Sequence, residues 1–104
     1  LKGPFVQVNC SAIPKELFES EMFGHEKGAF SGAVSKYNGK IAEANGGTLY
    51  LDELDSMPLE QQAKLLKVIE EKEFSAVGSN KVQKSNFRLI CSAQKDLKKM
   101  IEEG

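Results

Sequence analysis

Two adjacent carboxylates follow the most apolar segment of the sequence. Residues 48–51 read Thr-Leu-Tyr-Leu, and Asp52 and Glu53 come directly after them. Open α/β sheets place ligands at the carboxyl ends of their strands, where one carboxylate can hold Mg²⁺ through water and the next can activate a water molecule for phosphoryl transfer. An acidic pair at this position serves equally well as a helix cap or a solvated strand end. The pair alone therefore leaves both interpretations open.

The elements that must position these carboxylates can be read from the apolar pattern. Residues 5–9 and 87–92 are rich in β-branched and aromatic side chains, and with residues 48–51 they predict three short strands. The nearly continuous apolar character of residues 48–51 indicates a strand that is buried on both faces, as in a parallel sheet covered by helices. The order of strands and helices predicts a three-layer α/β domain with right-handed parallel crossovers.

Three helices are expected between and after these strands. Pro14 precedes a helix that carries Leu17, Phe18 and Met22 on one face, and residues 95–103 predict a last short helix. Pro58 opens the clearest helix. Its predicted apolar stripe is Leu59, Ala63, Leu66, Val68 and Ile69, and its predicted water-facing residues are Glu60, Gln61, Lys64, Lys67 and Glu71.

Composition excludes several classes of protein. The 104 residues include 40% hydrophobic and 28% charged residues, as in one globular unit, and the net charge of −1 argues against a surface that gathers nucleic acid non-specifically. Cys10 and Cys91 lie far apart, so we expect buried free thiols in a reducing cytoplasm. No apolar run approaches the roughly 20 residues of a membrane helix. His25 has no second imidazole nearby in sequence and is interpreted as a structural or surface residue.

Four blocks of sequence, in the same order, resemble a known family. Residues 5–14, 21–33, 46–54 and 62–69 are similar to the sigma-54 interaction domain of bacterial enhancer-binding proteins, a branch of the AAA+ ATPases. The resemblance covers nearly the whole chain. It implies an AAA+ fold, that is, a P-loop NTPase-like parallel sheet, here partial and with a glycine-rich loop inserted.

The glycine-rich segment of residues 24–39 contains the counterpart of the family's GAFTGA loop, which contacts the sigma factor. The matching residues are Gly28, Ala29, Phe30, Ser31, Gly32 and Ala33. Glycines let a backbone rearrange, and one exposed aromatic side chain supplies an anchor, so the resemblance implies that Phe30 makes the contact. Ser31 keeps a hydroxyl where the family usually has Thr. The alternative is a buried Phe within a glycine-rich surface loop.

The resemblance also assigns roles at the ends of the strands. Asp52 and Glu53 match the Walker B pair, so Asp52 is the expected metal partner and Glu53 the expected base. Asn9 matches the amide that hydrogen-bonds this glutamate, and its alternative role is an Asx turn. Gln94 falls where the family senses the γ-phosphate. The family usually reads Ala-Thr-Asn there, whereas this chain reads Ser-Ala-Gln, which puts γ-phosphate sensing in doubt.

The sequence contains no GxxxxGK[ST] loop to hold phosphates, which in the family lies just before the first strand. We therefore expect residues 1–104 to be the central part of a longer ATPase domain. The parent protein would bind ATP and Mg²⁺, assemble into a ring, act on sigma-54 and RNA polymerase, and contact DNA through a separate domain. The alternative is a degenerate module of the same fold that does not hydrolyse ATP.

Overall fold

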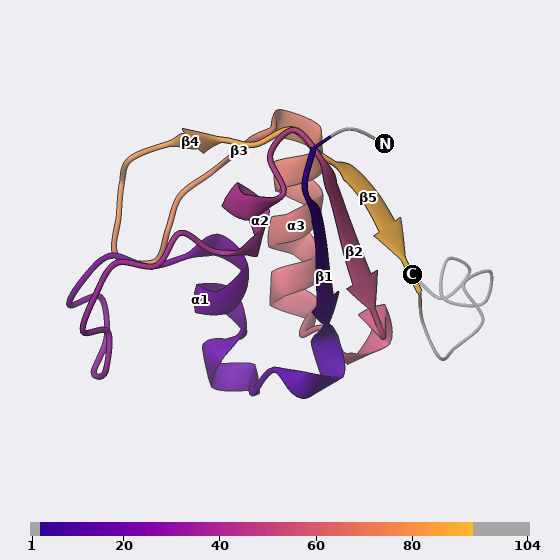
Figure 1. The fold of residues 1–104 in the computed structure, drawn as a ribbon. Helices are drawn as coiled ribbons and strands as arrows, with labels where there is room; N and C mark the ends of the chain where they lie inside the picture. The colour runs from indigo at the N-terminus through magenta and orange to yellow at the C-terminus, as the bar shows by residue number, and fades with distance from the viewer. Residues whose placement is uncertain (1–2, 93–104) are drawn as a thin grey trace.

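The computed structural model describes residues 3–92, which are built around a parallel three-stranded sheet (Figure 1). Strands β1 (Phe5–Asn9), β2 (Thr48–Asp52) and β5 (Arg88–Cys91) lie in the order β1-β2-β5. All three predicted strands are therefore confirmed, and they are neighbours. The predicted helix of residues 95–103 lies outside the described residues, and so does Gln94.

The remaining elements are short, apart from one helix. They are α1 (Phe18–Phe23), α2 (Lys40–Glu43), α3 (Leu59–Glu71), the antiparallel pair β3 (Glu73–Phe74) and β4 (Gln83–Lys84), and 3₁₀ turns at Cys10–Ala12, Lys15–Leu17 and Leu54–Ser56. Within the part of the chain that is described, no helix is long and apolar enough to cross a membrane.

The register of the strands separates a buried face of the sheet from a more open one. Val8 pairs with Leu51, which pairs with Cys91, so these side chains form one row across the sheet. This row and the parallel row that contains Leu49 pack into the hydrophobic core with α1 and α3. On the opposite face Tyr50 remains half-buried. The expected burial of β2 on both faces is thus complete only on the face that the described helices cover.

Helix α1 has the apolar face expected for the segment after Pro14. Phe18 and Met22 are each 1% exposed and lie in the core. Leu17 belongs to the 3₁₀ turn before the helix and is 42% exposed, because the turn directs it away from the face on which Phe18 lies. Two of the three residues predicted on this face of the helix are therefore confirmed.

Helix α3 begins where predicted, directly after Pro58, but its buried face differs from the predicted stripe. Leu59, Leu66 and Ile69 are exposed. The buried residues, spaced as one face of a helix, are Gln61, Leu65 and Val68. Val68 in the predicted stripe is therefore confirmed, whereas the prediction that Gln61 faces water is wrong. The helix is apolar on two adjacent faces, and the described core covers the one that carries Leu65. Counting apolar residues could not tell which face the sheet would take.

Helix α2 and the β3–β4 pair were not expected from the sequence. Helix α2 follows Gly39, whose backbone packs so closely on Gly24 that an added Cβ would lie 2.4 Å from the Gly24 nitrogen. Ile41 in α2 is fully buried, and the buried Ser85 hydroxyl donates a hydrogen bond of 2.7 Å to its carbonyl oxygen. These contacts are long-range, so the local pattern did not reveal them.

Candidate functional site

The ends of the three parallel strands meet at one edge of the sheet. Asn9 and Asp52 are register partners, and Glu53 follows Asp52 directly. Ser92, the residue after β5, donates its backbone N–H to the Leu51 carbonyl at 2.9 Å and accepts a hydrogen bond from the backbone of Leu54 at 2.8 Å. The register thus places Asn9, Asp52 and Glu53, which the sequence predicted at this edge, at the ends of two adjacent strands.

Asp52 is half-buried and has a side-chain partner that sequence reasoning missed. Its Oδ1 accepts a hydrogen bond of 2.5 Å from the Ser92 hydroxyl. This bond fixes the carboxylate from the neighbouring strand. The only signal in the sequence was a hydroxyl residue at the end of a predicted strand, which is common and does not identify a partner.

Glu53 adopts a backbone conformation that is unusual for its residue type. Its φ of 55° and ψ of 53° are left-handed, which costs a residue with a Cβ about 1–2 kcal/mol. The described chain has one other such residue, Lys72, at φ 59°. Lys72 ends α3, a position where left-handed geometry closes a helix. Glu53 instead joins β2 to the 3₁₀ turn at Leu54–Ser56, and strained residues that do not close a helix cluster at functional sites.

Asn9 caps the turn that follows β1. Its Oδ1 accepts hydrogen bonds from the Ser11 backbone N–H at 3.0 Å and from the Ser11 hydroxyl at 2.8 Å. The Asx-type role that the sequence left as an alternative is therefore present. A contact between the Asn9 amide and Glu53 stays a prediction.

The carboxylates at this edge affect the pKa of a neighbouring thiol. Cys10 is 2% exposed, and its pKa is raised to about 11, first by burial and then by Cys91, Asp52, Glu53 and Asp55. Burial also raises the pKa of Cys91. Both cysteines are free, as expected, although Cys91 is only half-buried. The negative potential at the strand ends would favour a cation there.

The described residues contain no cluster of three or more acidic, histidine or cysteine side chains that could enclose a metal ion. Mg²⁺ commonly binds through one or two carboxylates, with waters and substrate phosphates completing its coordination. Asp52 at a negatively charged edge fits that mode of binding. It does not fit a site made of protein ligands alone.

The segment of residues 24–39, called here the contact loop, extends beyond α1 on the side away from β5 (Figure 1). The loop is closed at its base by a pair of backbone hydrogen bonds between His25 and Tyr37, of 2.8 and 2.9 Å. Near its tip the Gly28 N–H donates to the Ala33 carbonyl at 2.8 Å. Gly28 and Gly32 both have positive φ, so the glycines shape this turn.

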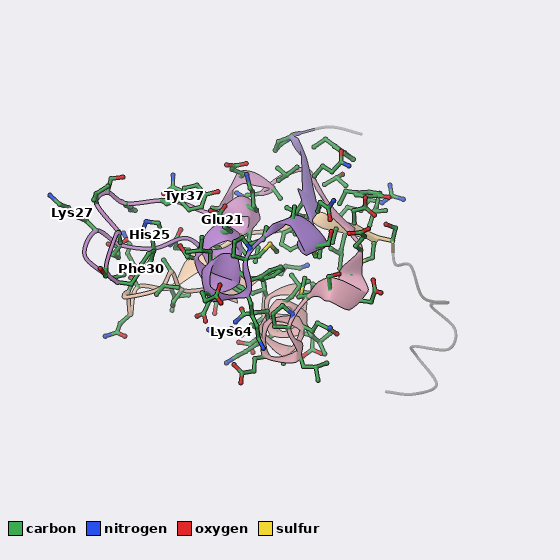
Figure 2. The ribbon with its side chains drawn as sticks, turned by 90° about the horizontal axis from the view of Figure 1, so that it is seen from below. Glu21, His25, Lys27, Phe30, Tyr37 and Lys64 are labelled. Carbon is green, nitrogen blue, oxygen red and sulfur yellow. The ribbon has the colours of Figure 1, made fainter. Side chains whose placement is uncertain are left out.

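The side chain of Phe30 is neither fully exposed to solvent nor part of the hydrophobic core. It is half-buried, and its ring centroid lies 5.0 Å from that of His25 in an edge-to-face arrangement (Figure 2). The expectation of a freely exposed aromatic side chain is met only in part. Val34, directly after the motif, is 81% exposed and was not singled out by the sequence. Ala33 in the motif is buried and Ser31 is exposed.

The fold defines the class: the chain has the α/β fold of AAA+ ATPases. More narrowly, it belongs to the family described as the sigma-54 interaction domain, whose model matches residues 1–104.

Individual relatives agree with this assignment. The chain is 50% identical over 103 residues to the regulatory protein AtoC of Escherichia coli. The matched region covers 99% of this chain and 22% of AtoC. It is 48% identical over 101 residues to the Nif-specific regulatory protein of Azotobacter vinelandii, covering 97% of this chain and 19% of that protein.

Among solved structures, NtrX of Brucella abortus superposes with a TM-score of 0.85 at 42% identity. The superposed region covers 98% of this chain and 22% of NtrX. NtrX in complex with ATP superposes with a TM-score of 0.81, covering 98% of this chain and 21% of NtrX. The chain thus spans about a fifth of the length of these relatives.

Proposed function

We propose that this chain is the central part of the ATPase domain of a sigma-54-dependent transcription activator, which uses ATP hydrolysis to remodel the sigma-54 RNA polymerase complex. The observation that carries the proposal is the parallel register that sets Asn9 opposite Asp52, directly before the strained Glu53. Family membership and the ATP complex of NtrX, a structural relative, support it.

In this proposal the strand edge performs the chemistry. Bound ATP and Mg²⁺ supply the phosphoryl group and its activation. Asp52, held by Ser92, is the residue that would hold the metal through water, and Glu53 would orient the attacking water and accept its proton. Asn9 lies beside them and responds to the state of Glu53. Gln94 falls at the position where the family senses the γ-phosphate, with its amide one methylene further out than the usual Asn.

The contact loop is the proposed surface for the sigma factor. Residues 28–33 lie at its tip, with glycines that permit rearrangement and with Phe30 as the aromatic anchor. The partners of the whole protein are sigma-54 and RNA polymerase, together with further copies of itself in a ring. DNA is bound through a separate domain, and the protein acts in the bacterial cytoplasm.

Two substitutions in the full-length protein test the two halves of the proposal. Glu53→Ala should lower ATPase turnover by about 100-fold or more, the usual loss for a general base, whereas Glu60→Ala on the exposed face of α3 should stay within about twofold. Phe30→Ala should weaken binding to purified sigma-54 by at least about tenfold and leave ATPase activity in place. Unchanged turnover in Glu53→Ala would overturn the catalytic half.

A second candidate function is a regulatory module of the same fold that binds nucleotide without hydrolysis. The observation that favours it is the sequence Ser-Ala-Gln at residues 92–94, where the family usually has Ala-Thr-Asn. Nucleotide binding by the full-length wild-type protein without any turnover would support this alternative. Ordinary turnover would exclude it.

A further inference from the structure

The ring of His25 lies at the root of the contact loop and is held on both sides. Its Nδ1 is 2.6 Å from the hydroxyl of Ser20 in α1, and its Nε2 is 3.0 Å from the carbonyl oxygen of Ser35. A carbonyl oxygen can only accept, so Nε2 carries a proton, and in the neutral ring Nδ1 accepts from the Ser20 hydroxyl. The two bonds fix both the tautomer and the plane of the ring.

This fixed ring is the surface against which Phe30 packs. The ring centroids of His25 and Phe30 are 5.0 Å apart with an interplanar angle of 74°, an edge-to-face pair. Tyr37 completes the cluster at 5.7 Å from His25 (Figure 2). The orientation of Phe30 therefore depends on a ring whose own orientation is set from α1.

The backbone of the same region joins three segments that are distant in sequence. His25 bridges Tyr37 on the outgoing side of the loop and Val77 in the segment between β3 and β4. The Glu26 N–H donates to the Val77 carbonyl at 3.0 Å, and the Val77 N–H donates to the Gly24 carbonyl at 2.9 Å. A second side-chain contact to α1 is a hydrogen bond of 3.4 Å from the Tyr37 hydroxyl to Glu21.

We propose that His25, acting through its hydrogen bond to Ser20, is a positioning residue that sets the conformation in which Phe30 is presented to the sigma factor. The proposal rests on the proposed function of the contact loop. It extends the binding determinant beyond residues 28–33 to a histidine and a serine that do not touch the partner. Their contribution is preorganisation, which lowers the entropy lost when the loop binds.

The test uses the full-length protein with Ser20→Ala and His25→Phe, the second of which keeps an aromatic ring but removes both hydrogen bonds. Hydrogen exchange of residues 26–36 should become about fivefold faster in Ser20→Ala, the factor that corresponds to one neutral hydrogen bond, and at least that much faster in His25→Phe, which loses two. The Kd for purified sigma-54 should rise by about fivefold. ATPase kcat and KM should stay within about twofold.

A matched control separates positioning from general loss of structure. Ser85 is, like Ser20, a buried serine, and its hydroxyl donates one hydrogen bond to the carbonyl oxygen of Ile41. Ser85→Ala should leave loop exchange and sigma-54 affinity unchanged. The double variant Ser20→Ala, His25→Phe should be no worse than His25→Phe alone, because the serine acts only through the imidazole.

If Ser20→Ala and His25→Phe leave loop exchange and sigma-54 affinity at the level of Ser85→Ala, the positioning role is overturned. Phe30→Ala in the same binding assay separates this outcome from failure of the proposed function. Weak binding by Phe30→Ala with normal binding by the His25 and Ser20 variants rejects only the positioning role. Normal binding by Phe30→Ala rejects the loop as the contact surface and the positioning role with it.

Discussion

The carboxyl edge of the sheet and the contact loop are held by different kinds of interaction. At the edge, Asp52 is placed by the ladder of three parallel strands, and Leu49 and Leu51 of its own strand are fully buried in the core. The contact loop has few buried apolar residues, and a few backbone hydrogen bonds and the ring of His25 hold it. The edge is therefore built for fixed geometry, whereas the loop can rearrange when a small number of polar contacts break.

The largest expected effect separates the two regions by stability. Leu51→Ala should lower the free energy of unfolding by about 2 to 5 kcal/mol, because it leaves a cavity under the strand that carries Asp52. Val34→Ala in the contact loop, at a side chain that is 81% exposed, should change it by less than about 0.5 kcal/mol. Urea unfolding of the full-length protein measures both. Equal losses would contradict the comparison.

Asn9 allows its structural role to be separated from its proposed catalytic role. Asn9→Ala should cost about 1 kcal/mol, because the turn at Cys10–Ala12 loses its cap, whereas Asn9→Ser keeps an acceptor for that turn and should retain most of the stability. If the amide also acts on Glu53, both variants should lose ATPase activity to a similar degree. Full ATPase activity in Asn9→Ser would show that Asn9 only caps the turn and has no catalytic role.

The two left-handed residues outside glycine sharpen the contrast between structural and functional strain. Lys72→Gly should stabilise the protein by about 1 kcal/mol, since glycine adopts this conformation at the end of a helix without a Cβ penalty. Glu53→Gly relieves the same type of strain but should abolish ATPase turnover. Urea unfolding of both variants measures the change in stability, and steady-state ATPase assays measure the change in turnover. A stabilised and fully active Glu53→Gly protein would contradict the assignment of Glu53.

The last expected effect is a dependence of stability on alkaline pH. The pKa of Cys10 is raised from 9.0 to about 11 in the folded state, so the unfolded chain loses the thiol proton first. The resulting stabilisation is present below pH 9 and is lost as the pH rises through about 11. The difference in unfolding free energy between wild type and Cys10→Ala should narrow over this range. A constant difference from pH 8 to pH 11 would argue against the raised pKa.

Local sequence patterns predicted the strands well because each strand is a short apolar run bounded by turn residues. The parallel order then placed Asn9 and Asp52 at one edge. The same approach predicted the start of α3 but misplaced most of its buried face, since Leu59 and Leu66 are exposed and Gln61 is buried. A helix with two apolar faces offers both to a core, and only the position of the sheet decides between them.

Sequence alone determined the α/β class, the three strand segments, the acidic pair at residues 52–53 and the glycine-rich loop, because these depend on residue type and local spacing. Tertiary structure decided that Ser92 holds Asp52 and that Ser20 and Ser35 hold the ring of His25. It also decided that Phe30 packs on that ring. These contacts join residues from different elements, and their geometry exists only after the chain has folded.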